Sequence, residues 1–207
     1  MPSHVERALA DAARALSMLR ADRAALAAIE AAGALLADAL AQRHRVLACG
    51  NGGSLCDAMH FAEELSGRFR RDRPPLPASA IADPAHLSCT ANDYGWHEVF
   101  ARWIEAHGGP GDVLVAISTS GASPNVLRAA ERARARGMHV IALVGRRDAP
   151  LADAADLVIP TPAGRWSDRV QELHIKVLHI LVEEVERRLF PGEARPRERD
   201  AERPLHA

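Results

Sequence analysis

The sequence predicts an α/β protein of the three-layer α/β/α class, with helices on both faces of a five-stranded, parallel, doubly wound sheet. Two observations lead to this fold class. Five short β-rich runs alternate with helix-length segments, and such alternation builds parallel sheets through right-handed crossovers. A chain of 207 residues also has room for one domain of this kind, which buries a core without disulfides or metals.

Two amphipathic helices are expected before the sheet. Residues 3–43 are rich in Ala and Leu with charges at helical spacing, and the pattern breaks near residues 20–22. The apolar faces of these helices need a partner.

The strands and crossover helices are expected between residues 45 and 190. A long final helix over residues 167–189 carries enough apolar positions to be largely buried. From Pro191 to Ala207 the composition turns to Pro, Arg and acidic residues, which predicts a flexible tail. The β-rich runs are 45–49, 78–82, 112–117, 139–144 and 156–159, and the other helical segments are 54–69, 84–91, 96–107, 123–136 and 149–154.

Charge and composition exclude several function classes. The formal net charge is -1, so we expect no general affinity for nucleic acid or for a membrane surface. No apolar run approaches the roughly 20 residues that span a bilayer, and the N-terminus is charged where a signal peptide needs an apolar core. The 3 cysteines lack a C-x-x-C pairing and fit reduced thiols. We therefore expect a cytoplasmic protein with a small ligand.

The hydroxyl-rich turn from Ser118 to Ser123 is the strongest candidate for a ligand site. It follows the predicted strand 112–117, and Ser123 as N-cap with Pro124 in the first turn starts the next helix. A phosphate there meets backbone N–H groups, the positive end of the helix dipole and up to four hydroxyls, from Ser118, Thr119, Ser120 and Ser123. Serines that only cap and turn are the alternative.

A second strand-to-helix turn, residues 49–54, reads Cys-Gly-Asn-Gly-Gly-Ser. Its three glycines let the backbone approach a ligand closely, and Asn51 and Ser54 add side-chain contacts. It matches neither the P-loop nor the G-x-G-x-x-G pattern. Two such turns on neighbouring strands favour one site for a small phosphorylated sugar.

Two predicted helices carry polar residues at spacings that suit a metal. His60 and Glu64 are i and i+4 on one helix, and Gln171 and His179 are i and i+8 on the final helix. If the two helices converge, this set of N and O donors suits a divalent metal such as Zn²⁺. Ordinary core or surface pairs are the alternative. His174 is assigned to packing or to an interface.

Four motifs together resemble the phosphoheptose isomerases, enzymes of the sugar isomerase (SIS) domain family. They are GNGGS at residues 50–54, DAMHFAEEL at 57–65, ISTSG at 117–121 and QELHIKVLH at 171–179. The resemblance extends to about residue 189. It implies a flavodoxin-like SIS domain over residues 1–190, in which residues 1–44 form oligomerisation helices and residues 45–190 form the α/β core.

The resemblance implies an aldose-ketose isomerase. Its reaction converts D-sedoheptulose 7-phosphate to D-glycero-D-manno-heptose 7-phosphate through an enediol. This is the first step of nucleotide-activated heptose biosynthesis for cell-surface glycans, the lipopolysaccharide core or a capsule. It also implies one Zn²⁺ per subunit and a homotetramer with sites at subunit interfaces, which gives the N-terminal helices a partner.

The resemblance further implies a role for each site residue. The zinc ligands are His60, Glu64, Gln171 and His179, with Glu64 and His179 as the acid/base pair. Substrate contacts fall to Glu64, Gln171, Asn51, Gly52, Gly53, Asn92 and Asp93 for the sugar and to Ser118, Thr119, Ser120 and Ser123 for its phosphate. Asp168 resembles a residue near the reacting carbons.

Two other function classes are alternatives to the isomerase. Some close relatives are non-catalytic SIS-domain proteins that associate with the bacterial replication initiator and lack the acid/base residues, whereas this chain has Glu64 and His179. A sugar-sensing transcription regulator needs a DNA-binding segment, and only about forty residues precede the first strand. Ala122, Pro124 and Leu55 depart from the expected family pattern, but they remove no hydroxyl donor.

Overall fold

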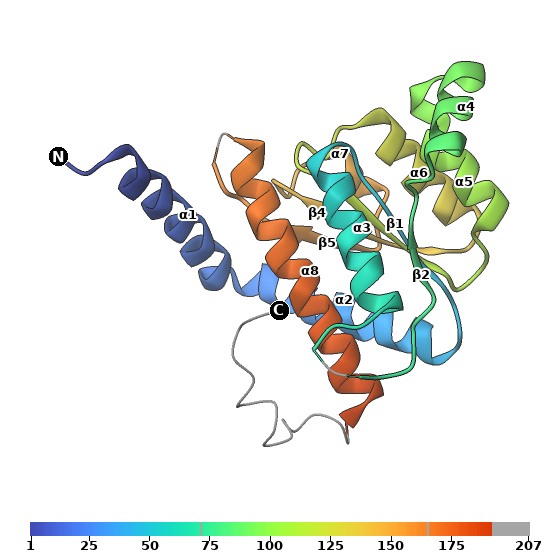
Figure 1. Ribbon diagram of the computed structural model, residues 1–207, viewed down its shortest axis with the longest axis horizontal. Coiled ribbons are helices and arrows are strands. Elements are labelled where there is room, and N and C mark those ends of the chain that lie inside the picture. The colour runs from blue at the N-terminus through green and yellow to red at the C-terminus, as the bar shows by residue number, and fades with distance from the viewer. Residues whose placement is uncertain (71, 165, 192–207) are drawn as a thin grey trace.

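The computed structural model describes residues 1–70, 72–164 and 166–191. Two helices precede an alternation of strands and helices (Figure 1). The elements are α1 (His4–Ala21), α2 (Arg23–Ala41), β1 (Val46–Cys49), α3 (Gly53–Ser66), β2 (Ala78–Ala80), α4 (Pro84–Tyr94), the 3-10 helix η1 (Trp96–Glu98), α5 (Val99–His107), β3 (Val113–Ser118), α6 (Pro124–Ala135), β4 (His139–Val144), α7 (Pro150–Asp153), β5 (Leu157–Pro160) and α8 (Ser167–Leu189).

The five strands form one parallel sheet in the order β2-β1-β3-β4-β5. This is the order of flavodoxin-like doubly wound sheets, so the predicted fold class is confirmed. The strand order reverses between β1 and β3, and ligands of such sheets bind beyond the carboxyl ends of the strands at this point. Both predicted ligand turns leave these two neighbouring strands.

Alternate residues of β3 face two separate cores. Val113, Val115 and Ile117 pack in the core that includes α2, α3 and α8, whereas Leu114 and Ala116 pack in the core that includes α5 and α6. All five side chains are fully buried. A strand covered on both faces reads as a continuous apolar run, which is why the sequence pattern finds it.

The helix α2 is long and apolar enough to cross a membrane by composition alone, which was not expected from the sequence. It packs against α8, and at Gly33 the approach is so close that an added Cβ would meet the Glu184 Cβ at 2.6 Å. Ala25, Ile29 and Leu36 are among its buried residues. These contacts are those of a core helix.

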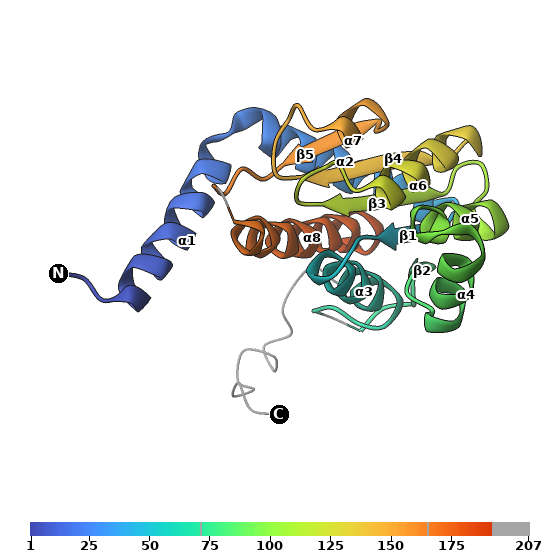
Figure 2. The ribbon, with the colours of Figure 1, turned by 90° about the horizontal axis from the view of Figure 1, so that it is seen from above.

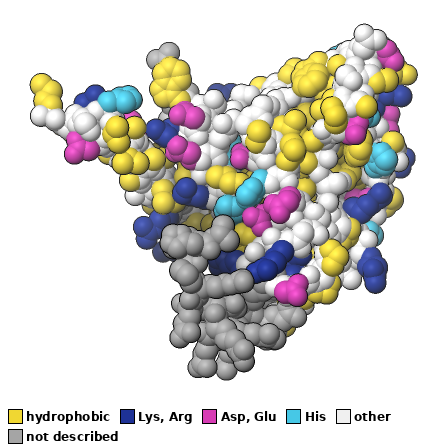
Figure 3. Space-filling view, in the orientation of Figure 1, with side chains coloured by type: hydrophobic (Ala, Val, Ile, Leu, Met, Phe, Trp, Pro, Cys, Tyr) yellow, Lys and Arg dark blue, Asp and Glu magenta, His cyan; other side chains and the backbone are white. Residues whose placement is uncertain are grey.

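The helix α1 projects away from the rest of the molecule (Figures 1 and 2). Only Ala15 and Leu19 are buried, near its C-terminal end. Val5 and Leu9 are exposed large hydrophobic residues, and Figure 3 shows apolar side chains on the surface of this helix. The described residues of this chain leave that face uncovered.

Two predicted boundaries are wrong. The helix expected over residues 54–69 ends at Ser66, because the following loop turns back under its last turn. The turn expected at Asn92 and Asp93 is helical, and α4 continues to Tyr94, where it is capped by Gly95 with a positive φ of 92°. Residues 192–207 of the predicted tail lie outside the described residues.

Candidate active site

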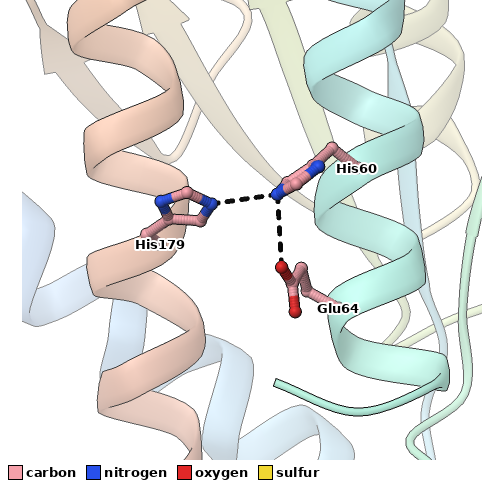
Figure 4. Close-up of side chains that lie close together, drawn as sticks. All are labelled: His60, Glu64 and His179. Atoms are coloured by element: carbon pink, nitrogen blue, oxygen red, sulfur yellow. Dashed lines mark hydrogen bonds and ion pairs between the residues drawn. The ribbon is translucent and has the colours of Figure 1, made fainter. Parts of the chain in front are cut away.

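Three of the four predicted metal ligands converge between α3 and α8. His60 Nε2 lies 3.2 Å from Glu64 Oε1 and 3.0 Å from His179 Nε2. Figure 4 shows the three side chains pointing toward one another from the two helices. The i,i+4 spacing places His60 and Glu64 on one face of α3, and α8 packs beside that helix. The convergence of the two helices, which the sequence left as a condition, is observed for three of the four side chains.

This triad of His60, Glu64 and His179 is open on one side and packed on the other. The His60 side chain is 45% exposed and that of Glu64 is 16% exposed. The His179 ring packs against Phe69, with 5.8 Å between the ring centroids. In Figure 3 histidine and acidic side chains adjoin on this face of the molecule, next to apolar side chains. A small ligand can therefore reach the triad from solvent.

The donors of the triad fit a zinc ion. Their ligand atoms all lie within 4.8 Å of one another. Two His and one Glu form a donor set of catalytic zinc sites, in which the fourth position stays open for water or substrate. The Nε2 atoms of His60 and His179 face each other, and a cation between them satisfies both lone pairs.

The fourth predicted ligand, Gln171 on α8, lies against the start of α3, beside the Gly-rich turn of residues 49–54. Its side chain packs against Gly53 at the start of α3, so that a Cβ on Gly53 would lie 2.7 Å from Gln171 Oε1. His179 follows eight residues later on α8, about 12 Å along the helix axis. The structure places Gln171 at the Gly-rich turn, and its role as a zinc ligand stays a prediction.

The Gly-rich turn is fixed by a pair of amide side chains. Asn51 Nδ2 donates to Asn125 Oδ1 at 2.8 Å, and Asn125 Nδ2 donates to Asn51 Oδ1 at 2.8 Å. Asn125 lies in α6 and is 1% exposed, so this pair ties the turn after β1 to the helix after β3. Gly52, the residue after Asn51, has a positive φ of 55°. The sequence did not reveal Asn125, because no local pattern links residues 74 positions apart.

The serine hydroxyls of the Ser118–Ser123 turn make hydrogen bonds within the turn itself. Ser118 is 4% exposed, and its Oγ accepts a hydrogen bond from the Gly121 N–H at 3.1 Å and contacts Ser123 Oγ at 3.1 Å. Thr119 is half-buried and Ser120 is exposed. Ser123 is the N-cap of α6, as predicted, but its hydroxyl makes no cap hydrogen bond. That hydroxyl therefore faces the turn instead of closing the helix end.

Gly121 allows the turn to close. Its φ is 63°, a conformation that favours glycine, and an added Cβ would lie 2.3 Å from Ala149 Cβ. Its carbonyl accepts a hydrogen bond from the Leu151 N–H at 2.9 Å. The turn is thus held against α7.

Three predicted substrate-binding residues lie away from the triad. Asn92 and Asp93 occupy the last turn of α4, where Asn92 Nδ2 donates to Asp93 Oδ1 at 2.7 Å. Asp168 lies in the first turn of α8 beside an open groove under α1, and its side chain is 66% exposed. In the described part of the chain, no hydrogen bond or ion pair connects these three to the triad, and their roles stay predictions.

Asp57, one turn before His60 on α3, is a second residue whose buried position the sequence did not reveal. Its Oδ2 atom is buried and has no hydrogen-bond partner among the described residues. Burial raises the pKa of Asp57 to about 6, and the charge of His60 partly opposes the rise. The i,i+3 spacing to His60 is the signal that could have found it.

Residues 9–145 match the family model of the SIS domain. The phosphoheptose isomerase of Aeromonas hydrophila is 52% identical over 185 residues, which cover 89% of this chain and 96% of that protein. The chain belongs to the phosphoheptose isomerase family. The resemblance inferred from the four sequence motifs is confirmed.

Solved structures agree with this placement among the phosphoheptose isomerases. Those from Neisseria gonorrhoeae and Francisella tularensis align with TM-scores of 0.80 and 0.81, at 37% and 32% sequence identity. Each covers 88% of this chain and is itself covered over 96% of its length. The shared architecture therefore spans most of this chain and nearly all of each relative.

Proposed function

We propose that this chain converts D-sedoheptulose 7-phosphate to D-glycero-D-manno-heptose 7-phosphate. The observation that carries the proposal is the convergence of Glu64 and His179, a carboxylate and an imidazole, in a member of the phosphoheptose isomerase family. Such an isomerisation needs a base for a carbon-bound proton, an acid for the oxygens and a group that stabilises developing charge. The triad offers all three functions.

The reaction moves one proton between neighbouring carbons through an enediol. Glu64 takes the proton from C1 of the ketose and returns it to C2. His179 transfers protons at the oxygens, so that the C2 carbonyl becomes a hydroxyl while the C1 hydroxyl becomes the aldehyde. His60, Glu64 and His179 would hold one zinc ion per subunit, which would supply Lewis-acid chemistry at the carbonyl oxygen. Gln171 is kept in the proposal as a further ligand.

The phosphate of the substrate is assigned to the turn after β3. The hydroxyls of Ser118, Thr119, Ser120 and Ser123 and the N-terminal end of α6 recognise its charge. The amide pair between Asn51 and Asn125 holds this end of α6 to the Gly-rich turn, which contacts the sugar. The remaining sugar contacts are assigned to Gly52, Gly53, Asn92, Asp93 and Asp168.

The proposal includes a homotetramer with its sites at subunit interfaces and a cytoplasmic location. Support for assembly comes from α1, whose Val5 and Leu9 are 65% and 67% exposed. Large apolar side chains at this spacing on a projecting helix form a typical contact surface for another subunit. Heptose made in the cytoplasm then feeds the synthesis of a cell-surface glycan.

The principal rival is a non-catalytic SIS-domain protein that associates with the bacterial replication initiator. Such a protein uses the fold and the phosphate turn without an acid/base pair. The presence and convergence of Glu64 and His179 favour the enzyme.

Turnover of the purified protein tests the proposed function. Zinc-loaded protein is mixed with sedoheptulose 7-phosphate, and the aldose product is followed by NMR. We expect heptose 7-phosphate to form, and we expect a chelator to abolish its formation and added zinc to restore it. Absence of product with zinc present would refute the isomerase, whereas full turnover after chelation would refute only the role of the metal.

A further inference from the structure

Arg73 is a buried arginine in the loop of residues 67–77, which links α3 to β2. Its side chain is 1% exposed. A buried guanidinium is costly unless its charge and its donors are satisfied, so the contacts of such a group identify what it holds together.

All three nitrogens of the Arg73 guanidinium donate hydrogen bonds. Nη2 donates to the Glu64 carbonyl at 2.6 Å, and Nη1 donates to the Leu65 carbonyl at 2.8 Å and to the Pro74 carbonyl at 3.2 Å. Nε donates to Glu186 Oε1 on α8 at 2.8 Å. Arg73 therefore caps the last turn of α3 and pairs with α8 at the same time.

These contacts lie next to the triad. The carbonyl that Nη2 binds belongs to Glu64 itself. Glu186 follows His179 by seven residues, which places it two turns further along nearly the same face of α8. The same loop also places Phe69 against the His179 ring. Arg73 thus joins the two helices whose separation sets the distance between Glu64 and His179.

We propose that Arg73 is a positioning residue that fixes the spacing of α3 and α8, and thereby the geometry of the triad of His60, Glu64 and His179. As a role in catalysis this rests on the proposed function, but the metal affinity of the triad reports the same geometry without turnover. The planar fork of arginine reaches two carbonyls and a carboxylate together, which a lysine ammonium cannot do.

The test compares Arg73→Met and Arg73→Lys with a matched control, Arg70→Gln. Arg70 belongs to the same loop and pairs with Glu183 on α8 at 2.7 Å, but the two side chains are 61% and 48% exposed. Among the described residues, Arg70 makes no hydrogen bond to a carbonyl of α3. Exposed ion pairs of this kind contribute little to the stability of a protein. The control therefore removes a charge and a bond to α8 without removing the cap of α3.

Zinc affinity of the metal-free proteins is measured by chelator competition, and kcat and KM are measured with sedoheptulose 7-phosphate. We expect Arg73→Met to weaken zinc binding about tenfold and to lower kcat about tenfold. KM should change little, because the Ser118–Ser123 turn, which is proposed to bind the phosphate, follows β3 and is not held by Arg73. The zinc affinity and kcat of Arg73→Lys should lie between those of Arg73→Met and wild type. Arg70→Gln should have the zinc affinity and kcat of wild type.

Wild-type zinc affinity and kcat in a folded Arg73→Met variant would overturn the proposal. If Arg73→Met does not fold, Glu186→Gln decides, because it removes the charge of the α8 partner and keeps the side-chain volume. We expect Glu186→Gln to weaken zinc binding, and unchanged zinc affinity in Glu186→Gln would overturn the proposal. Absence of turnover in wild type would refute the proposed function instead and would leave the zinc comparison intact.

Discussion

His174 is a fully buried histidine on α8, between the positions of Gln171 and His179. Burial lowers its pKa to about 4, and the nearby Val144 carbonyl only partly opposes the shift. Neither ring nitrogen of His174 makes a hydrogen bond of normal geometry to the described residues. The packing role expected from the sequence agrees with this burial, and the histidine remains neutral in the folded protein at neutral pH.

The neutral state of His174 makes stability depend on pH. An unfolded chain protonates this histidine below the ordinary histidine pKa of 6.5, whereas the folded chain does so only near pH 4. Stability from this residue is therefore complete above pH 6.5 and is lost as the pH falls toward 4. We expect wild type to lose about 2 kcal/mol more than His174→Leu between pH 7 and pH 5.

Urea unfolding of wild type and His174→Leu at the two pH values measures this difference directly. Equal losses in both proteins would show that His174 does not cause the acid sensitivity. His139 is exposed, so His139→Leu is the matched control and should lose as much stability as wild type.

Some residues of the site can be recognised from local sequence spacing, and others cannot. His60 and Glu64 stand one turn apart on one helix, so their common face follows from the sequence. Asn125 and Arg73 could not be found in this way, because their partners lie 74 and 113 positions away. Only the packing of β1 beside β3, and of α3 beside α8, brings these pairs together.

At the scale of elements, the turn between β3 and α6 owes its shape to Gly121. A methyl group there meets Ala149, and the positive φ adds strain. We expect Gly121→Ala to distort the phosphate site and to raise KM for sedoheptulose 7-phosphate about tenfold, with a smaller effect on kcat. Steady-state kinetics of the purified variant measure both.

Gly109→Ala is the control for that substitution. Gly109 has no positive φ, and its added Cβ would come no closer than 3.8 Å to another residue. Its kinetics should equal those of wild type. An unchanged KM in a folded Gly121→Ala protein would show that this turn does not bind the substrate.

Sequence periodicity placed the elements well wherever burial is continuous. The strands and α8 are found at or within about two residues of their predicted positions, because their apolar runs are buried on the faces that the pattern implies. The end of α4 is set locally, beside the positive φ of Gly95. The miss at the end of α3 depends on tertiary contacts. Arg73 caps α3 from a loop, and this contact has no local signature.

At the scale of the whole molecule, α1 is a long helix with little cover, because only Ala15 and Leu19 of its 18 residues are buried. Its amphipathic pattern showed that a partner is needed, but only the structure shows that the described body of the chain supplies none over most of its length (Figure 2). We expect the double variant Val5→Glu, Leu9→Glu to dissociate the proposed tetramer, because each charge would be buried in the contact between subunits.

Light scattering after size-exclusion chromatography measures the mass of that variant. Ala135→Glu, an exposed position on α6 across the sheet from α1, is the control and should remain a tetramer. A double variant with the mass of a tetramer would show that α1 does not form the contact.

Glu64 on α3 is the proposed base of the sugar-phosphate isomerase. Its role is tested by measuring kcat of zinc-loaded Glu64→Gln with sedoheptulose 7-phosphate, beside wild type. We expect kcat to fall about 10²–10⁴-fold, the usual contribution of a general base. A folded Glu64→Gln protein with kcat within about threefold of wild type would contradict it.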